Sequence, residues 1–340
     1  VVANGLEQVG TASNEELVAG FVPQAYGWQW HFRGSLVALD VKTGAIRWQT
    51  YMVPEGYYGG AIWGSTGAVD LERKLVYMAT GNNYWIPESA QACLRAGTAA
   101  STCLAPDNHF DSIVAVELDT GRIRWASRGL PTDAWNVGCG LHIPFVFDIN
   151  ENDNCPNPRG PDWDFAQGPI LMGDDKTGGK IVGAGQKSGM FWAFDAKTGQ
   201  LAWATQAAPG GITGGLQWGS ASDGRRIYVA ASNAGDASQQ TPPKPWKLLD
   251  GSTTTAGGWA ALDRKTGAVL WTTKDPLDSR AEGAVSAVND VMFGCSMNGL
   301  MYALATKDGK VLWSHNGGGM CNAGPTVSDG MVYWGSGTFA

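Results

Sequence analysis

The sequence predicts an all-β fold, a β-propeller built from repeated four-stranded blades, and three observations support this prediction. First, an eleven-residue pattern occurs five times: a strand end, a tight turn and a returning strand that finishes on Trp. The copies end at Trp48, Trp125, Trp203, Trp271 and Trp313. Second, the last two copies are 42 residues apart, the length of one blade. Third, 48 Gly and 16 Trp in 340 residues suit many short strands joined by tight turns.

Each repeat also contains short runs of β-branched and aromatic residues that are bounded by Gly, Asn and Asp. Clear examples are residues 74–80, 226–231, 290–295 and 299–304. We expect the Trp that ends each copy to wedge between neighbouring blades, where a large flat ring fills the gap between twisted sheets. Stability then comes from stacking one unit on the next.

The longer intervals between copies carry insertions at residues 84–110, 129–162 and 234–258. Loops of this length are usually functional or mobile, and in a propeller they can build the rim of the central funnel. The first copy begins almost without a complete blade before it. We therefore expect residues 1–340 to be one propeller domain that covers about five to six blades of a larger ring.

Composition and motifs exclude several classes of function. A net charge of −7 with 16% charged residues gives no electrostatic case for binding nucleic acid or an anionic membrane. No apolar run is long enough to span a bilayer. The four His lie in unrelated loops, which argues against a zinc or haem cluster, and neither a CxxCH haem motif nor a GxGxxG nicotinamide motif is present.

The six Cys form three local couples, and none has the short spacing of a zinc or redox site. The couples are Cys93 with Cys103, Cys139 with Cys155, and Cys295 with Cys321. They are either buried free thiols or loop-closing disulfides, each of which would contribute about 3 kcal/mol. Disulfides are favoured, and they predict an oxidising compartment, so that the protein is periplasmic or secreted.

The repeat ALDxKTGxxxW occurs together with Gly81-Asn-Asn-Tyr-Trp85 after a strand and with Trp63-Gly64 upstream of it. In this combination it resembles the pyrroloquinoline-quinone (PQQ)-dependent alcohol dehydrogenases. The stretches NHFDSIVAVE, PTDAWNVGCG and PDWDFAQGPIL are most similar to the polyvinyl-alcohol dehydrogenase branch. The resemblance covers essentially the whole chain, and it implies an eight-bladed quinoprotein propeller with PQQ and Ca²⁺ in the central funnel.

The resemblance also implies three calcium ligands, Glu7, Asn82 and Asp164, of which Asp164 is in addition the catalytic base. Carboxylate and amide oxygens are the hard ligands that Ca²⁺ takes at ~2.4 Å. Each residue also has an ordinary explanation, as a solvated turn residue, a turn former and a local cap respectively. Asp133, in PTDAWN, resembles the base motif too. Asp164 is preferred because the residues after it continue the family pattern.

Three further residues match positions that contact the cofactor in this family. Trp63 matches the ring that forms the floor under the quinone, and Lys187 matches the cation beside its reactive carbonyl, where it would act in catalysis. Asn233 matches an additional hydrogen-bonding residue of the quinone. An exposed turn lysine is the ordinary alternative for Lys187.

The resemblance implies an enzyme that oxidises secondary alcohols, polyvinyl alcohol in particular, and passes the electrons to a separate cytochrome c. Two other functions stay open. One is a non-catalytic propeller of the outer-membrane-assembly scaffold type, which shares the repeats. The other is a PQQ dehydrogenase that acts on small alcohols or sugars.

Overall fold

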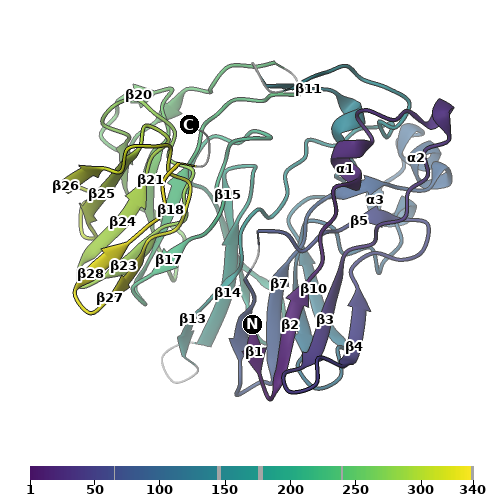
Figure 1. Ribbon diagram of the computed structural model, residues 1–340, viewed down its shortest axis with the longest axis horizontal. Coiled ribbons are helices and arrows are strands. Elements are labelled where there is room, and N and C mark those ends of the chain that lie inside the picture. The colour runs from purple at the N-terminus through teal and green to yellow at the C-terminus, as the bar shows by residue number, and fades with distance from the viewer. Residues whose placement is uncertain (65, 144–146, 175–178, 239, 338–340) are drawn as a thin grey trace. The chain divides into compact units, whose positions relative to one another are not determined.

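Short antiparallel strands form five four-stranded sheets in the computed structural model, which describes residues 1–64, 66–143, 147–174, 179–238 and 240–337 (Figure 1). The chain divides into two compact units. Unit 1 comprises residues 1–165 and 237–240, and unit 2 comprises residues 166–236 and 241–340. Each unit is described by itself below.

Unit 1 holds two of the four-stranded sheets. The first consists of β1 (Val2–Ala3), β2 (Leu6–Gly10), β3 (Ser35–Asp40) and β4 (Ile46–Tyr51). The second is ordered β10-β9-β7-β6, from β6 (Ala68–Asp70), β7 (Leu75–Ala79), β9 (Ser112–Glu117) and β10 (Ile123–Arg128). Two small sheets pair β5 (Tyr58–Gly59) with β8 (Asn83–Trp85) and β11 (Leu141–Ile143) with β12 (Phe147–Ile149).

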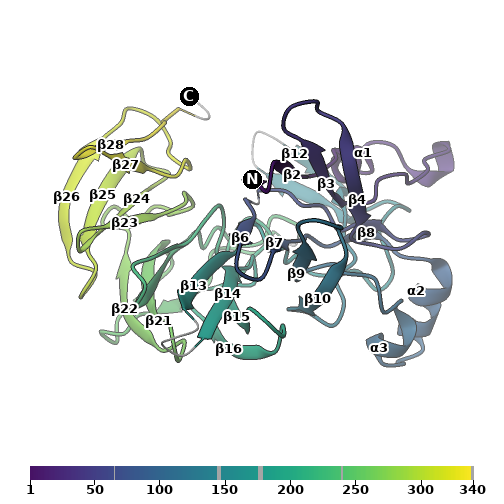
Figure 2. The ribbon, with the colours of Figure 1, turned by 90° about the horizontal axis from the view of Figure 1, so that it is seen from below.

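Unit 2 holds the other three four-stranded sheets, which Figure 2 shows from below. The first consists of β13 (Ile170–Asp174), β14 (Gly179–Gly185), β15 (Met190–Asp195) and β16 (Leu201–Gln206). The second consists of β17 (Ala221–Ser222), β18 (Arg226–Ala231), β21 (Gly258–Asp263) and β22 (Val269–Lys274). The third consists of β23 (Ser286–Val288), β24 (Val291–Cys295), β25 (Leu300–Ala305) and β26 (Val311–Asn316). Two pairs are added, β19 (Trp246–Lys247) with β20 (Thr253–Thr254) and β27 (Thr326–Ser328) with β28 (Met331–Tyr333). The all-β prediction of five to six blades is confirmed.

The first repeat lies in β3 and β4 of the first sheet. β1 and β2 precede it in the same sheet, where β1 pairs with β2 and β2 pairs with β3 in a register that joins Leu6 to Asp40 and Gly10 to Leu36. Residues 11–34 separate β2 from β3, so that the strand pattern is interrupted in the sequence although the sheet is continuous in space.

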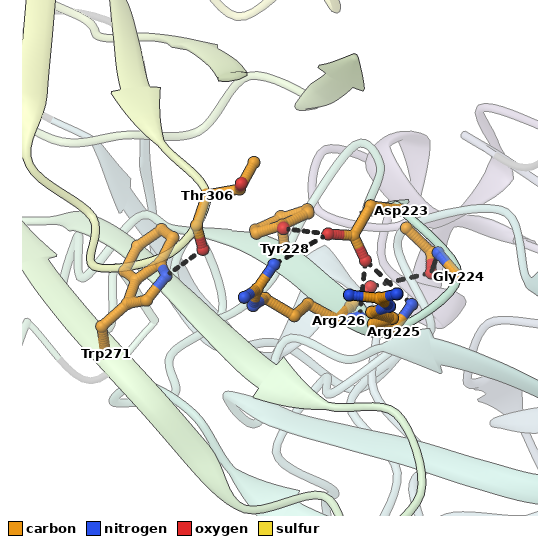
Figure 3. A network of polar contacts seen from close by, with 8 residues as sticks. Asp223, Gly224, Arg225, Arg226, Tyr228, Trp271 and Thr306 are labelled. Carbon is orange, nitrogen blue, oxygen red and sulfur yellow. Dashed lines mark hydrogen bonds and ion pairs between the residues drawn. The ribbon is translucent and has the colours of Figure 1, made fainter. Parts of the chain in front are cut away.

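The repeated Trp docks on the following sheet, as predicted, in three places within the units. The indole Nε1 donates to a backbone carbonyl of the next sheet, from Trp48 to Leu118 at 3.1 Å, from Trp203 to Arg264 at 3.0 Å and from Trp271 to Thr306 at 2.8 Å (Figure 3). Burial of the ring and the hydrogen bond of its N–H together stabilise the packing of one blade on the next.

Two further residues complete each docking contact, and the sequence analysis missed one of them. Two positions after the Trp, the hydroxyl of Thr205 donates to the carbonyl of Gly267 at 2.7 Å. Gly267 has a φ of +72°, and a Cβ there would lie 2.4 Å from the Trp203 ring. The Gly is therefore required twice, for its backbone conformation and for the approach of the ring. The recurrence of Thr or Ser after Trp-x was the available signal.

Trp313 departs from this arrangement. Its side chain is 44% exposed, and its ring stacks on His315 at 5.8 Å with an interplanar angle of 6°. His315 stands where the other copies have Thr or Ser.

The structure also contains short helices that were not predicted from the sequence. Three lie in the predicted insertions, α2 (Glu88–Arg95), α3 (Ala100–Cys103) and η2 (Val137–Cys139), and two lie between β2 and β3, α1 (Glu15–Val18) and η1 (Gln24–Tyr26). Pro87 directly before α2 and Arg95 in its last turn were the signals for that helix. Residues 144–146 and 239 of the predicted insertions lie outside the described residues.

All three predicted disulfides are formed: Cys93–Cys103, Cys139–Cys155 and Cys295–Cys321. The alternative of buried free thiols is thereby excluded. In the part of the chain that the structure describes, no helix is both long and apolar enough to cross a membrane.

Candidate active site

The candidate site in unit 1 is built around Gly81, in the turn that follows β7. Its N–H donates to the carbonyl of Ala61 at 2.8 Å, and its own carbonyl accepts from the N–H of Asp111 at 3.0 Å. A Cβ at this position would lie 2.5 Å from Asp164 Oδ1 and 2.9 Å from Trp63 Nε1. Only the missing side chain of Gly81 therefore lets the carboxylate and the indole approach the same point of the backbone.

Asn82 and Asp164 are held together at this point. The backbone N–H of Asn82 donates to Asp164 Oδ1 at 2.5 Å, and its side-chain Nδ2 donates to the carbonyl of Trp135 at 2.8 Å. Asn82 is 1% exposed and Asp164 is 2% exposed. The structure thus brings two of the predicted calcium ligands and Trp63, the predicted floor of the quinone site, into one buried place.

Glu7 does not share this environment. It lies in β2, where its backbone pairs with Val2 and Leu39, and its side chain is exposed. The side chain that is buried at this point of the strand belongs to its neighbour Gln8, and no partner reaches the amide atoms of Gln8 among the described residues. The side chain of Glu7 is therefore exposed, whereas those of Asn82 and Asp164 are buried.

Asp133 acts as a bracket for the segment that carries Asp164. Its Oδ1 accepts from the backbone N–H of Asp162 at 3.0 Å, and its Oδ2 accepts from that of Trp163 at 2.6 Å. Its own carbonyl accepts from the N–H of Asn83 at 3.0 Å. Both carboxylate oxygens of Asp133 therefore bind the backbone, and the choice of Asp164 as the base stays a prediction.

Asp111 is a buried acid behind the site that the sequence analysis missed. It is fully buried, and none of the described residues donates a hydrogen bond to either carboxylate oxygen. Burial, followed by the charges of Asp133 and Asp164, raises the pKa of Asp111 well above its ordinary value. Burial also raises the pKa of Asp133 to about 7, although the N–H of Trp163 opposes the shift. Once Asp111 is protonated, its O–H group is able to donate a hydrogen bond to the carboxylate of Asp133.

The donor chemistry of Asn82 and Asp164 suits Ca²⁺, which binds carboxylate and amide oxygens. Within the described ranges, however, no group of three or more His, Cys, Asp or Glu side chains is arranged to hold a metal. Asn82 and Asp164 offer two side chains with oxygen atoms at this point, and the binding of Ca²⁺ by them stays a prediction.

Lys187 and Asn233 lie in unit 2. Lys187 is 7% exposed, which excludes the alternative of an ordinary exposed turn lysine. Asn233 lies at a φ of +50°, and its Nδ2 contacts the carbonyls of Lys244, Thr255 and Ala256 while its Oδ1 accepts from the N–H of Lys244 at 3.0 Å. The amide of Asn233 holds the loop after β18, and a bond to a quinone stays a prediction that would replace one of these contacts.

An aromatic cluster adjoins the candidate site in unit 1. It consists of Trp28, Trp30, Phe32, Tyr58, Trp63, Tyr84 and Trp85, packed with Ala19 and Ala61. Trp63 belongs both to this cluster and to the site at Gly81. The sequence analysis missed the other rings. The alternating aromatic run of residues 28–32 and the aromatic pair that follows Asn83 were the signals.

The sequence and the fold of this chain are similar to those of known proteins. A family model described as outer membrane protein assembly factor BamB matches residues 256–338. The chain is 32% identical to the polyvinylalcohol dehydrogenase of Sphingopyxis sp. (strain 113P3), over 90% of this chain and 47% of that protein. It is 31% identical to the polyvinylalcohol dehydrogenase of Pseudomonas sp., over 91% of this chain and 48% of that protein.

The chain is a member of the PQQ-dependent dehydrogenase family. The structure of the quinohemoprotein alcohol dehydrogenase from Comamonas testosteroni matches 97% of this chain and 54% of that protein, with a TM-score of 0.64 and 17% identity. This likeness establishes the fold. The chain spans about half the length of the curated relatives that it matches.

Proposed function

We propose that this member of the family oxidises secondary alcohols, polyvinyl alcohol among them, with bound PQQ and Ca²⁺. The observation that carries the proposal is the convergence of Asp164, Asn82 and Trp63 on the backbone at Gly81. A repeat-built scaffold has no need for a buried carboxylate, an amide and an indole at one glycine. The similarity to two polyvinylalcohol dehydrogenases supports the choice of substrate.

Each residue of the site has a definite task in this proposal. Asp164 takes the hydroxyl proton of the alcohol on its carboxylate. The amide oxygen of Asn82 and the carboxylate of Asp164 hold Ca²⁺, and the ring of Trp63 supports the planar cofactor. PQQ, when bound, supplies the redox chemistry by accepting two electrons from the alcohol. Asp133 keeps Asp164 in place through the N–H groups of Asp162 and Trp163.

The compartment and the electron acceptor belong to the same proposal. Three disulfides fit folding outside the cytoplasm, in the periplasm or after secretion. In this proposal the electrons leave to a cytochrome c. The roles proposed for Asp164, Asn82, Trp63 and Asp133 do not depend on the roles predicted for Lys187, Asn233 and Glu7.

The experiment that tests the function is reconstitution of the full chain with PQQ and Ca²⁺. Oxidation of butan-2-ol and of polyvinyl alcohol is followed with an artificial electron acceptor. We expect activity that depends on PQQ, is lost with a calcium chelator and returns when Ca²⁺ is added. Absence of turnover on every alcohol, with no PQQ bound, would leave the scaffold function that the match over residues 256–338 favours.

A further inference from the structure

We propose that the aromatic cluster is the substrate-binding surface for an extended aliphatic chain with closely spaced secondary hydroxyl groups. The inference rests on the proposed function, because it assigns residues to the polymer substrate of that same site. The cluster lies in unit 1 and is formed by residues 28–32, 58, 63, 84 and 85.

The rings form a continuous apolar surface that is only partly covered. Trp28 meets Trp30 edge to face at 5.5 Å, and Trp30 stacks on Trp85 at 6.4 Å with an interplanar angle of 17°. Trp30 and Tyr84 are buried, whereas Trp28, Trp85 and Trp63 are half-buried. Half-exposed aromatic faces gain free energy when a hydrocarbon backbone covers them.

Two indole groups in the cluster also lack a hydrogen-bond partner. The Nε1 atoms of Trp28 and Trp30 are buried, and no acceptor among the described residues reaches them. A buried donor without a partner costs about 1–3 kcal/mol, so these groups favour a ligand that brings acceptor oxygens. A polyol chain offers both features that the cluster can recognise, because it carries CH groups for the ring faces and hydroxyl oxygens for the N–H groups.

The segment that presents these rings is fixed from behind. Glu15, at the start of α1, accepts the backbone N–H groups of His31 at 3.0 Å and Phe32 at 2.8 Å. The side chain of Asn154, next to the Cys139–Cys155 disulfide, donates to the carbonyl of Ala19 at 2.8 Å. Rings that are already held in place lose little conformational entropy when a ligand binds.

The cluster is continuous with the reacting groups. Trp63 packs against it and also lies beside Asp164 at Gly81, while Tyr84 follows Asn82 by two positions. One hydroxyl of a long chain can therefore reach Asp164 while neighbouring units of the same chain cover the rings. A small alcohol has no further units, so its oxidation does not require Trp28 or Trp85.

The test uses the full chain and polyvinyl alcohol itself as the probe. Binding to cross-linked polyvinyl alcohol is measured by sedimentation without cofactor, for the wild type, Trp28→Ala, Trp85→Ala and the ring-conserving Trp28→Phe. Trp313→Ala is the matched control, because Trp313 is an exposed Trp of unit 2 whose ring stacks on His315. Polyethylene glycol, which lacks secondary hydroxyls, is the control polymer.

We expect each Ala variant to weaken polymer binding about tenfold, which corresponds to about 1.4 kcal/mol. Trp28→Phe, which keeps an aromatic ring but loses the indole N–H, should weaken it less, and Trp313→Ala should bind nearly as the wild type does. With PQQ and Ca²⁺ added, the Ala variants should lose activity on the polymer and keep it on butan-2-ol. If Trp28→Ala does not fold, Trp85→Ala and Trp28→Phe decide.

Polymer binding that is equal in all variants would overturn the inference, and so would an equal loss of activity on polymer and butan-2-ol. A loss confined to electron transfer to a cytochrome would overturn it too, because the rings would then be a protein contact. The proposed function fails separately, through absence of turnover on butan-2-ol by the wild type.

Discussion

Two acids of this protein, the solvent-exposed Asp223 in unit 2 and the buried Asp111 in unit 1, have opposite surroundings. Asp223 accepts from the hydroxyl of Tyr228 at 2.7 Å, from the guanidinium of Arg226 at 3.1 Å and from the backbone N–H groups of residues 225 and 226 (Figure 3). Asp111 has no donor on either carboxylate oxygen among the described residues. Both carboxylate oxygens of Asp223 therefore accept hydrogen bonds, whereas those of Asp111 accept none from the described residues.

The pKa values follow this difference. Partial burial raises the pKa of Asp223, but the bonds from Tyr228 and from the N–H groups of Arg226 and Arg225 outweigh it, so that the pKa ends below its ordinary value. Burial raises the pKa of Asp111, and the nearby charges of Asp133 and Asp164 add to the shift. Carboxylates with several hydrogen-bond donors stabilise the folded chain, whereas buried carboxyl groups without donors are typical of functional sites.

The largest effect is expected for Asp164→Asn. The amide keeps the size of the side chain and one oxygen for the N–H of Asn82, but it removes the proton acceptor. Activity on butan-2-ol should fall about a thousandfold, since a general base contributes 10²–10⁴ in rate. The free energy of unfolding should change little. Asp119→Asn, at an exposed carboxylate, is the control, and equal turnover of both variants would show that Asp164 is not the base.

A smaller effect, on stability alone, is expected for the scaffold glycines of unit 2. Gly267→Ala places a methyl group 2.4 Å from the Trp203 ring at a φ of +72°, whereas Gly318→Ala meets no atom within 4 Å at a φ of +85°. Gly267→Ala should lower the free energy of unfolding by about 3 kcal/mol and Gly318→Ala by about 1 kcal/mol. Urea unfolding measures both, and equal losses would mean that the ring does not pack on Gly267.

The pH dependence of stability sharpens the comparison of the acids. The pKa of Asp133 is raised from 3.8 to about 7 in the folded protein, so its contribution to stability is present at low pH and is lost as the pH rises through 7. Asp111, which faces Asp133, Asp164, Asp162 and the guanidinium of Arg128, acts in the same direction. The lowered pKa of Asp223 acts in the opposite direction, because its contribution is lost as the pH falls.

Asp111→Asn should therefore flatten the pH dependence of the metal-free protein. Between pH 5 and pH 8 the wild type should lose stability through both acids, and the variant should lose clearly less. Urea unfolding at both pH values measures the difference. An unchanged pH dependence in Asp111→Asn would mean that the two carboxyl groups are not coupled.

The smallest effect is expected for Tyr228→Phe. The variant removes one hydrogen bond to Asp223, which keeps its contacts with Arg226 and with the backbone. The free energy of unfolding should fall by about 1 kcal/mol, with no change in the oxidation of butan-2-ol. A loss of activity in this variant would contradict the scaffold role of the network.

The sequence predicted those features that leave a local, repeated pattern. Trp48, Trp203 and Trp271 were found as docking residues because each copy of the repeat is contiguous in the chain. The three disulfides were found because their cysteines are local couples. The continuity of the first sheet was not predicted, because β1 has two residues and residues 11–34 separate β2 from β3 in the sequence.

The site was predicted less completely, because its contacts join distant segments. Asn82 and Asp164 are 82 positions apart, and family resemblance alone linked them. The bracket from Asp133 to the N–H groups of Asp162 and Trp163, and the missing donors of Asp111, have no local pattern. The exposure of Glu7 was also not predictable, since a one-residue difference along β2 decides whether Glu7 or Gln8 is buried.

The central claim is that Asp164, Asn82 and Trp63 form a cofactor site, and equilibrium binding of PQQ tests it most directly. Binding is measured spectroscopically with the full chain, with Ca²⁺ and with a chelator, for the wild type, Trp63→Ala and Asp164→Asn. We expect calcium-dependent binding that both substitutions weaken and that Trp313→Ala leaves unchanged. Binding that is independent of Ca²⁺ and equal in all four proteins would contradict the account.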